Sequence, residues 1–429
     1  MHWPFGGRSV LCLAMRAPPY SSRLDELFSR EAIDDPYPLS ARLRRECPMS
    51  RVADTGVHLV ATWDLIDEAL AREADFSANL TGVLVRGPHG PPTTLALPPS
   101  PASRVIATAD EPAHAVHRAV VQRRLTPPNV TALEPEIRSW ARDAVAEWIE
   151  GGAGDFIPVA ELIPARVVAK LLGLPDGDVS RHRTWAMMGG DILAGDITQE
   201  QLTTLSRESR RMGEYLAAHF ERARTEPRAD AEAPLLHWLA RGVEAGDIAT
   251  DEAVGIATVL FGAGGESTAA LIGSVARRLA ADPQLADRLR RDADLVPVFV
   301  EEVTRLETPF KFHYRVVRRE CELGSVSLRT GDRLMLLWAS ANRDASRIDD
   351  PDALRLDRRH PRDHMSFGRG AHFCIGAGLA RLEAKIVCEE LLAQTACLAP
   401  CPEPEPVYAK SIFVRRLERL PLCATRSSR

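Results

Sequence analysis

The stretch Phe367-Gly368-Arg369-Gly370-Ala371-His372-Phe373-Cys374-Ile375-Gly376 surrounds a single cysteine with three glycines. Glycine removes side-chain bulk near the sulfur and allows backbone conformations that are closed to other residues. The sequence predicts a helix that begins just after Cys374, so its free backbone N–H groups would point toward the sulfur and favour the thiolate. Such a loop can present an anionic sulfur to a flat cofactor that needs close backbone approach.

The other cysteines give no comparable signal. The chain has eight, at positions 12, 47, 321, 374, 388, 397, 401 and 423, and no pair has the CxxC spacing of zinc ribbons or thioredoxin-type redox motifs. A zinc site at His372 and Cys374 would need two further ligands that the nearby sequence does not supply. We therefore expect a reducing cytoplasm with mostly free, buried thiols.

The glycine-rich stretch resembles the haem-binding loop of cytochrome P450 enzymes, Phe-Gly-x-Gly-x-His-x-Cys-x-Gly, at every specified position. Leu379-Ala380-Arg381 also matches the usual continuation of that loop. The resemblance implies haem b, with Cys374 as the thiolate ligand of its iron and Phe367 and Gly376 beside the cofactor. The alternative is an inert buried cysteine next to a glycine-rich turn.

A second stretch, Glu302-Val303-Thr304-Arg305, matches the Glu-x-x-Arg helix motif of the family. Residues three apart share a helix face, so Glu302 and Arg305 can pair and reach a third group together. Arg358 lies where the family has that third group, and Asn342-Arg343-Asp344 matches a common element between the two. Alone, this motif would indicate only a surface ion pair.

Four further residues are implied as haem propionate partners. His114 and Arg118 stand one helical turn apart, and Arg315 and His372 occupy positions with the same role. Several cations around two carboxylates are physically reasonable, because buried propionates need charge-assisted hydrogen bonds. For His114 alone, the alternative is an exposed helix residue.

The segment Phe261–Thr268 brings three glycines into a long apolar helix, where each costs about 1 kcal/mol relative to alanine. Either close helix packing or a ligand lying against the backbone would explain them. The family has Ala-Gly-x-Asp/Glu-Thr-Thr here, in a helix that passes over the iron. The matching residues are Ala263, Gly264, Glu266 and Thr268, with Ser267 in place of the usual threonine. An acid beside an alcohol suits proton delivery during oxygen activation, and we expect Glu266, Ser267 and Thr268 to carry it.

Composition and periodicity limit the class of protein and the fold that the sequence can have. Lys plus Arg number 54 and Asp plus Glu 59, so the net charge is −5, with 45% apolar and 26% charged residues. These values exclude disorder and argue against nucleic acid as the main partner. We expect a mainly α fold with small β-sheets, strands near 312–318, 325–328 and 333–339, and an irregular proline-rich segment over 80–109. The expected organisation is a loose arm over 1–22, one large haem domain over 23–424 and a tail over 425–429.

The resemblance implies a haem-thiolate monooxygenase that inserts one atom of O2 into a small hydrophobic substrate. Electrons would come from a ferredoxin and its reductase, as in soluble bacterial members, docking at a basic face with Arg123, Arg124, Arg362, Arg369 and Lys385. The family plan also implies a substrate pocket lined by the 80–109 segment, by 185–197 and by residues 310–313, which include Phe310, Lys311 and Phe312. Oxidative coupling and a haem-based binding or sensor protein stay as alternatives. We expect a cytoplasmic monomer with no membrane span.

Overall fold

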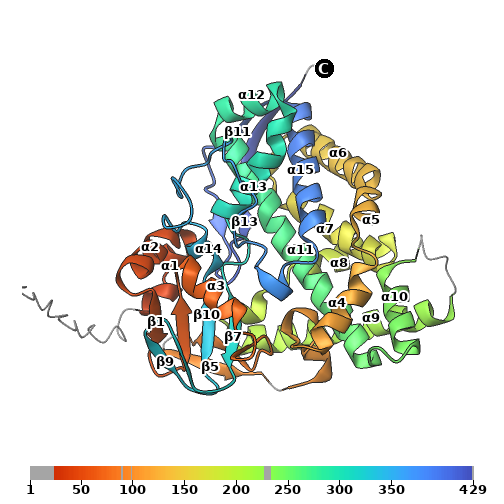
Figure 1. Cartoon of the computed structure of the whole chain (residues 1–429). Helices are drawn as coiled ribbons and strands as arrows, with labels where there is room; N and C mark the ends of the chain where they lie inside the picture. The colour runs from red at the N-terminus through yellow and green to blue at the C-terminus, as the bar shows by residue number, and fades with distance from the viewer. Residues whose placement is uncertain (1–23, 88–89, 98, 227–232, 428–429) are drawn as a thin grey trace, which may run out of the picture.

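Helix α11 (Thr250–Ala281) runs through the middle of the molecule (Figure 1). The computed structural model describes residues 24–87, 90–97, 99–226 and 233–427, so the predicted arm over 1–22 lies outside the described residues. Helices α7 (Ile157–Leu172), α8 (Val179–Ala186) and α15 (Ala377–Gln394) pack against α11. The long apolar segment of the sequence is thus the core helix around which the other helices assemble.

The remaining helices follow local sequence signals. For example, α9 begins at a capping box in which Thr198 and Gln201 bond each other's backbone N–H, and α7 ends at Gly173 with a left-handed φ of 85°. Their bounds are α1 Arg30–Asp34, α2 Tyr37–Glu46, α3 Trp63–Ala71, α4 Ala113–Gln122, α5 Pro127–Thr131, α6 Glu134–Glu150, α9 Gln199–Thr225, α10 Leu235–Glu244, α12 Pro283–Arg291, α13 Val296–Leu306 and α14 Trp338–Ala341.

The strands form one five-stranded sheet and four smaller ones, which confirms the expected mainly α fold with small sheets. In the large sheet the order is β1-β2-β10-β7-β3, and only the β2–β10 pair is parallel. Its strands are β1 Met49–Val52, β2 Val57–Val60, β3 Phe76–Ser77, β7 His313–Val317 and β10 Arg333–Leu336. This sheet lies in the β-rich part of the molecule, away from the helical part that holds α6, α7, α9 and α10 (Figure 1).

The sequence leaves two explanations for the glycines of α11, close helix packing and an open surface for a ligand, and the structure shows both. A Cβ at Gly265 would lie 2.4 Å from Ala186 Cβ, and one at Gly262 would lie 2.9 Å from Gly189 Cα, so these two allow α8 and the segment after it to pack closely. At Gly264 an added Cβ would meet only the Val168 side chain, at 3.5 Å. Gly264 therefore faces open space, and packing accounts for Gly262 and Gly265.

The proline-rich segment over 80–109 is more regular than predicted. Strands β4 (Gly82–Arg86) and β5 (Pro92–Ala96) form a two-stranded antiparallel hairpin within it. Pro92 is tolerated because it is the first residue of a strand that has a single partner, where one missing N–H costs little. The prediction of an irregular segment is therefore wrong for these strands and holds only for the residues that follow, which form short 3₁₀ turns.

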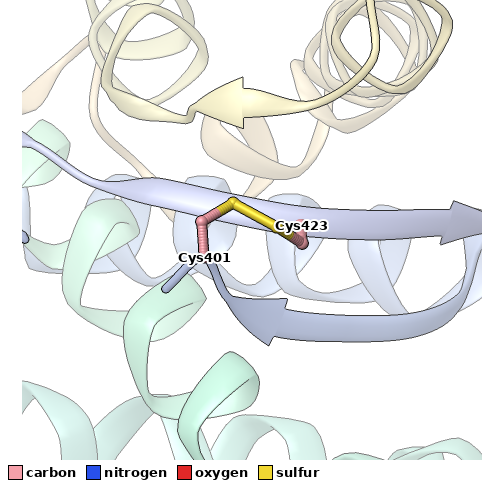
Figure 2. The surroundings of a disulfide bond; sticks show 2 residues. All are labelled: Cys401 and Cys423. Carbon is pink, nitrogen blue, oxygen red and sulfur yellow. A yellow bond between two sulfur atoms is a disulfide. The ribbon is translucent and has the colours of Figure 1, made fainter. Parts of the chain in front are cut away.

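Two cysteines that we expected to be free form a disulfide. Strand β11 (Thr395–Pro400) pairs antiparallel with β14 (Pro421–Arg426), and this brings Cys401 and Cys423 to a Cα–Cα distance of 5.2 Å (Figure 2). Such pairing depends on strand register and gives no short-spacing motif. Among the described free cysteines, only Cys388 is buried.

The remaining small strands are β6 Gly154–Asp155, β8 Cys321–Leu323, β9 Val326–Leu328, β12 Val407–Tyr408 and β13 Leu417–Arg419. Because β14 reaches Arg426, regular structure continues two residues beyond the predicted end of the haem domain at 424. Within the described residues, α11 is the one helix long and apolar enough to cross a membrane, and two thirds of its most apolar window are buried in the core.

Candidate active site

The cysteine loop folds back on itself before α15 begins. The backbone N–H of Cys374 donates to the carbonyl of Phe367 at 2.8 Å, which closes the loop into a tight hairpin. Gly368 and Gly370 take left-handed φ values of 68° and 71°, which side chains rarely adopt. Gly376 is the N-cap residue of α15, so Cys374 lies at the start of that helix, as predicted.

Asn342 fixes this loop to helix α13. Its Nδ2 donates to Ser366 Oγ at 2.8 Å and to Thr308 Oγ1 at 2.9 Å, and its Oδ1 accepts from Met365 N at 2.6 Å. Ser366 Oγ in turn donates to the carbonyl of Thr304 at 2.7 Å. The fully buried Asn342 is therefore saturated with hydrogen bonds, and it sets the position from which the cysteine loop departs.

Cys374 opens onto a cavity that lies between α11 and the start of α15. The surface of Cys374 is exposed to this cavity, but desolvation by the surrounding protein raises the pKa of its thiol. Hydrogen bonds from the backbone of Gly376 and Ala377 and the charges of Arg118 and Arg381 oppose that rise. The helix start and the two arginines thus favour the thiolate, and an electrophilic metal facing the sulfur would complete its deprotonation.

The four residues predicted to bind propionates all line the same cavity: His114, Arg118, Arg315 and His372. The His114 and His372 rings stack with centroids 3.9 Å apart. Burial and the surrounding cations lower the pKa of His372 to about 3, and burial lowers the pKa of Arg315 to about 10. The structure therefore gathers the positive charges of Arg118 and Arg315 and the rings of two histidines in one cavity.

These side chains have few hydrogen-bond acceptors of their own. Arg315 Nη1 donates to the neighbouring carbonyl of Tyr314 at 2.8 Å, and His114 Nδ1 contacts Glu111 at 2.8 Å. His372 Nδ1 is buried and has no hydrogen-bond partner in the described chain, and Arg118 has no ion pair within it. Because buried donors and charges are expensive to leave unpaired, this group of residues is suited to an anionic ligand.

Helix α11 contributes the opposite wall of the cavity. Ala263, Gly264, Ser267 and Thr268 all line it. Ser267 Oγ donates to the carbonyl of Ala263 at 2.6 Å, which leaves its lone pairs free to accept a hydrogen bond from the cavity. These residues therefore line the same cavity as Cys374, and their chemical roles stay predictions.

Glu266 does not line this cavity. Its carboxylate is fully buried on another side of α11, where Oε2 accepts from Gly190 N at 2.6 Å and Oε1 lies 3.3 Å from Arg416 Nε. Burial, assisted by Asp191, raises the pKa of Glu266 to about 7, although Arg416 opposes the shift. The carboxyl group is thus poised to gain or lose a proton near neutral pH, but its side chain must turn to reach Ser267.

The Glu-x-x-Arg motif forms a buried charge cluster, as predicted. Arg305 Nε and Nη2 donate to the two oxygens of Glu302 at 2.8 and 2.9 Å, and Arg358 Nε donates to Glu302 at 2.9 Å. Arg305 also donates to the carbonyls of Asn342 and Ala353, each at 3.0 Å. This cluster joins α13 to the segment before the cysteine loop, and it is fully hydrogen-bonded without any ligand.

Comparisons with known proteins point to one family. The sequence profile described as Cytochrome P450 matches residues 202–423. Cytochrome P450 144 of Mycobacterium tuberculosis is 38% identical over 400 residues, which cover 92% of this chain and 90% of the relative. Erythromycin C-12 hydroxylase of Saccharopolyspora erythraea is 32% identical over 342 residues, covering 79% and 85%. The chain belongs to the cytochrome P450 family.

Solved structures agree with this assignment. CYP109E1 from Bacillus megaterium in complex with testosterone superposes with a TM-score of 0.80 at 28% identity, covering 92% of this chain and 99% of that one. The protein is therefore a haem-thiolate monooxygenase of the P450 fold, and haem b is its cofactor. This confirms the predicted fold, enzyme class and cofactor.

The residues of this P450 fit that cofactor. A haem carries two carboxylates, and the cavity offers them the unpartnered Nδ1 of His372 and the guanidinium groups of Arg118 and Arg315. It also supplies a cysteine sulfur for the iron and, at Gly264, a helix surface with no side chain in the way. When bound, the haem would supply the oxygen-activating chemistry, with Cys374 as its thiolate ligand.

The predicted pocket lining of Lys311 and Phe312 is wrong. Alternation along a strand would put Lys311 on the face of Arg315, but β7 begins only at His313, so alternation does not extend back to Lys311. Lys311 Nζ donates to the carbonyl of Ser411 at 2.8 Å, and Phe312 packs against Tyr314 and Phe413. Phe310 does line the cavity.

The other predicted pocket segments contribute unevenly. Ile106 and Ala107 of the 80–109 segment line the cavity, and no described residue of 185–197 does. His313, the last residue of the predicted 310–313 segment, also lines the cavity. The sequence analysis gave no role to Trp338 or to the apolar residues of α7 that line it, Val167, Val168 and Leu171. Helical periodicity assigns these α7 residues to the core, so no signal in one sequence separates a packed face from a cavity wall.

Proposed function

We propose that this P450 inserts oxygen into a hydrophobic molecule that carries a carbonyl or hydroxyl group, with electrons from a separate ferredoxin and its reductase. The observation that carries the oxygen-insertion part is the position of Ser267, whose hydroxyl oxygen faces the cavity shared with Cys374. A haem-based sensor has no need of such an alcohol. Oxygen insertion is also the chemistry named for the relatives erythromycin C-12 hydroxylase and cyclomarin C epoxidase, which supports it over oxidative coupling.

The substrate class follows from the cavity wall. Ile106, Val259, Leu260 and Phe310 give it apolar surfaces, and few polar groups other than the cofactor partners interrupt them. The structural neighbour CYP109E1 has been solved with testosterone and with corticosterone, which are apolar molecules with oxygen at their edges. Testosterone is therefore a sensible first probe.

The chain's own residues would handle protons as follows. Ser267 Oγ accepts a hydrogen bond from a water or ligand in the cavity, because its own proton is donated to Ala263 O. Glu266 holds a proton near neutral pH and would pass it to Ser267 after turning away from Gly190 N and Arg416. Thr268 borders the same space and would position a water beside Ser267.

The proposal of oxygen insertion is tested by turnover of testosterone with a plant-type ferredoxin and its reductase, with product mass and hydrogen peroxide measured together. We expect a product heavier by one oxygen atom. Ser267→Ala should divert electrons into peroxide, whereas Ser267→Thr, which keeps the hydroxyl, should not. A dimeric product from the wild-type enzyme would instead support coupling, and unchanged coupling of electrons to product in Ser267→Ala would reject the role of Ser267.

Support for the ferredoxin site is mixed. Gly370, Ala371 and Phe373 of the cysteine loop are exposed, so a donor can approach near Cys374. However, Arg362, Arg369 and Lys385 each lie within 3.4 Å of a carboxylate oxygen, which reduces the positive field. If docking occurs there, Arg362→Glu should slow reduction and flatten its dependence on ionic strength, whereas Arg426→Glu on β14 should not.

Two further expectations belong to this proposal. We expect a monomer, which sedimentation of the haem-loaded protein tests. A cytoplasmic location stays a prediction from cysteine usage, and the Cys401–Cys423 disulfide does not favour it. Quantifying free thiols in protein taken directly from cells under acid quench would show whether the disulfide exists there.

A further inference from the structure

His313, the first residue of β7, lines the cavity and has its ring held by an indole. Trp338 Nε1 lies 2.7 Å from His313 Nδ1. An indole nitrogen can only donate, so His313 Nδ1 must accept and cannot carry a proton. The neutral ring therefore carries its proton on Nε2, and the tautomer of His313 is fixed by its neighbour.

The surroundings of the ring keep it neutral. Phe310 and Phe413 contact it edge-on, Trp338 donates to it, and Arg315 is the charged group that acts on it. Burial and the charge of Arg315 lower the pKa of His313 to about 4. No carboxylate of the described residues pairs with this imidazole.

The remaining nitrogen has no acceptor. Within the described residues, the Nε2–H group of His313 makes no hydrogen bond, and the cavity around it is walled mainly by apolar side chains. If a bound ligand shields this donor from water without accepting its hydrogen bond, binding is weakened, whereas a ligand oxygen that accepts the bond is oriented by it. A ring that only filled space would not need a fixed tautomer with a free N–H group.

We propose that His313 is a fixed hydrogen-bond donor for an oxygen acceptor bound in the cavity, and that Trp338 is the positioning residue that holds it in this tautomer. The inference rests on the proposed function, since haem and substrate share this cavity. The acceptor is either a haem carboxylate or a carbonyl or hydroxyl oxygen of the substrate. Both are oxygen acceptors, and the two sources are separable by experiment.

The tautomer is tested first, without cofactor or activity. In chain labelled with ¹⁵N-histidine, the His313 signal is identified by its absence in His313→Phe. At pH 7 we expect a protonated Nε2 and an unprotonated Nδ1 in the wild type, and a mixture of tautomers in Trp338→Phe. A proton on Nδ1 in the wild-type ring would overturn the proposal.

The ligand is tested in haem-loaded protein with His313→Phe, which keeps an aromatic ring, and His313→Gln, which keeps an amide donor. Affinity is measured from the shift of the haem absorption band for testosterone and for androstane, the same skeleton without oxygen. If the acceptor is on the substrate, His313→Phe weakens testosterone binding about 5–30-fold, leaves androstane unchanged, and His313→Gln restores part of the loss.

If the acceptor is a haem carboxylate, both ligands keep their relative affinities and haem dissociates about 5–30-fold faster from His313→Phe. Either result supports a donor role. Changes below twofold in both haem loss and testosterone affinity would overturn it, provided that the carbon monoxide complex still shows the thiolate-haem band. Absence of that band in the wild type would instead reject the proposed function, and the NMR result would still decide the tautomer.

Discussion

Arg305 and Arg315 are both buried arginines, with 1% and 8% of their surfaces exposed, but their surroundings differ completely. Arg305 donates to both oxygens of Glu302 and to backbone carbonyls. Within the described residues, Arg315 donates only to the carbonyl of the preceding residue, Tyr314. A buried charge whose partners are all in the chain stabilises the fold, whereas one without them is held for a ligand.

The largest expected effect on the free energy of unfolding is at Arg305, whose charge is fully paired within the chain. Arg305→Lys keeps the charge but removes the planar guanidinium that donates to both oxygens of Glu302. The buried carboxylate of Glu302 then loses one of its two hydrogen bonds from this residue. We expect the free energy of unfolding to fall by about 3–5 kcal/mol, as for other broken buried pairs. Urea unfolding followed by far-UV circular dichroism measures this.

Arg355→Lys is the matched control for that measurement. Arg355 pairs with Asp350 and Asp357 at a side-chain exposure of 36%, so its substitution should have little effect. A loss below about 1 kcal/mol in Arg305→Lys would show that the cluster around Glu302 does not hold the fold, and the comparison between Arg305 and Arg315 would lose its basis.

Glu266 is intermediate between Arg305 and Arg315, because it has one charged partner, Arg416, whose Nε lies 3.3 Å from its Oε1. With a folded pKa of about 7 and an ordinary value of 4.5, the folded chain holds a proton that the unfolded chain releases between these pH values. The free energy of unfolding therefore falls as pH rises through this window, by up to about 3 kcal/mol at pH 8. Glu266→Gln stays neutral and should lack this loss.

The measurement is urea unfolding of wild type and Glu266→Gln at pH 5 and pH 8. A smaller decline in the same direction should remain in the variant, because burial also raises the pKa of Asp191, to about 6. Glu418→Gln removes a half-exposed carboxylate near the same Arg416 and should leave the part of the decline that belongs to Glu266 intact. Identical pH profiles in wild type and Glu266→Gln would show that Arg416 neutralises the buried carboxylate.

The fully partnered cluster was easier to predict from sequence than the cavity. Motifs of fixed spacing placed Glu302, Arg305 and Cys374, because residues three apart share a helix face and glycines mark a tight loop. The direction of Lys311 was not predictable, since it depends on where β7 begins. The contact of His313 with Trp338 and the Cys401–Cys423 disulfide both depend on how distant segments meet.

At Arg315, the comparison predicts a large effect on haem binding and a small one on the stability of the haem-free chain. Arg315→Gln removes a charged donor to a haem carboxylate, so haem should dissociate about 10–100-fold faster, as expected for charge-assisted hydrogen bonds. The unfolding free energy of the haem-free chain should fall little, because the hydrogen bond that is lost runs only to the neighbouring carbonyl of Tyr314. Haem transfer to an excess acceptor protein measures the first, and urea unfolding the second.

Arg318→Gln is the control for this pair of measurements. It lies three residues further along the chain, is 43% exposed and pairs with Asp110, so haem loss should hardly change. A haem-free Arg315→Gln chain that is clearly less stable than wild type would mean that Arg315 has a structural role after all.

The smallest effect is expected where a short ion pair lies in water. Arg426 Nη1 is 2.8 Å from Glu150 Oε1, the same separation as between Arg305 Nε and Glu302 Oε1, but the two side chains are 63% and 62% exposed. Solvent screens this pair and already satisfies both groups, so Arg426→Ala should lower the unfolding free energy by less than about 0.5 kcal/mol. A loss above about 1 kcal/mol, measured by urea unfolding, would mean that distance rather than burial decides the value of an ion pair here, and the contrast between Arg305 and Arg315 would need another cause.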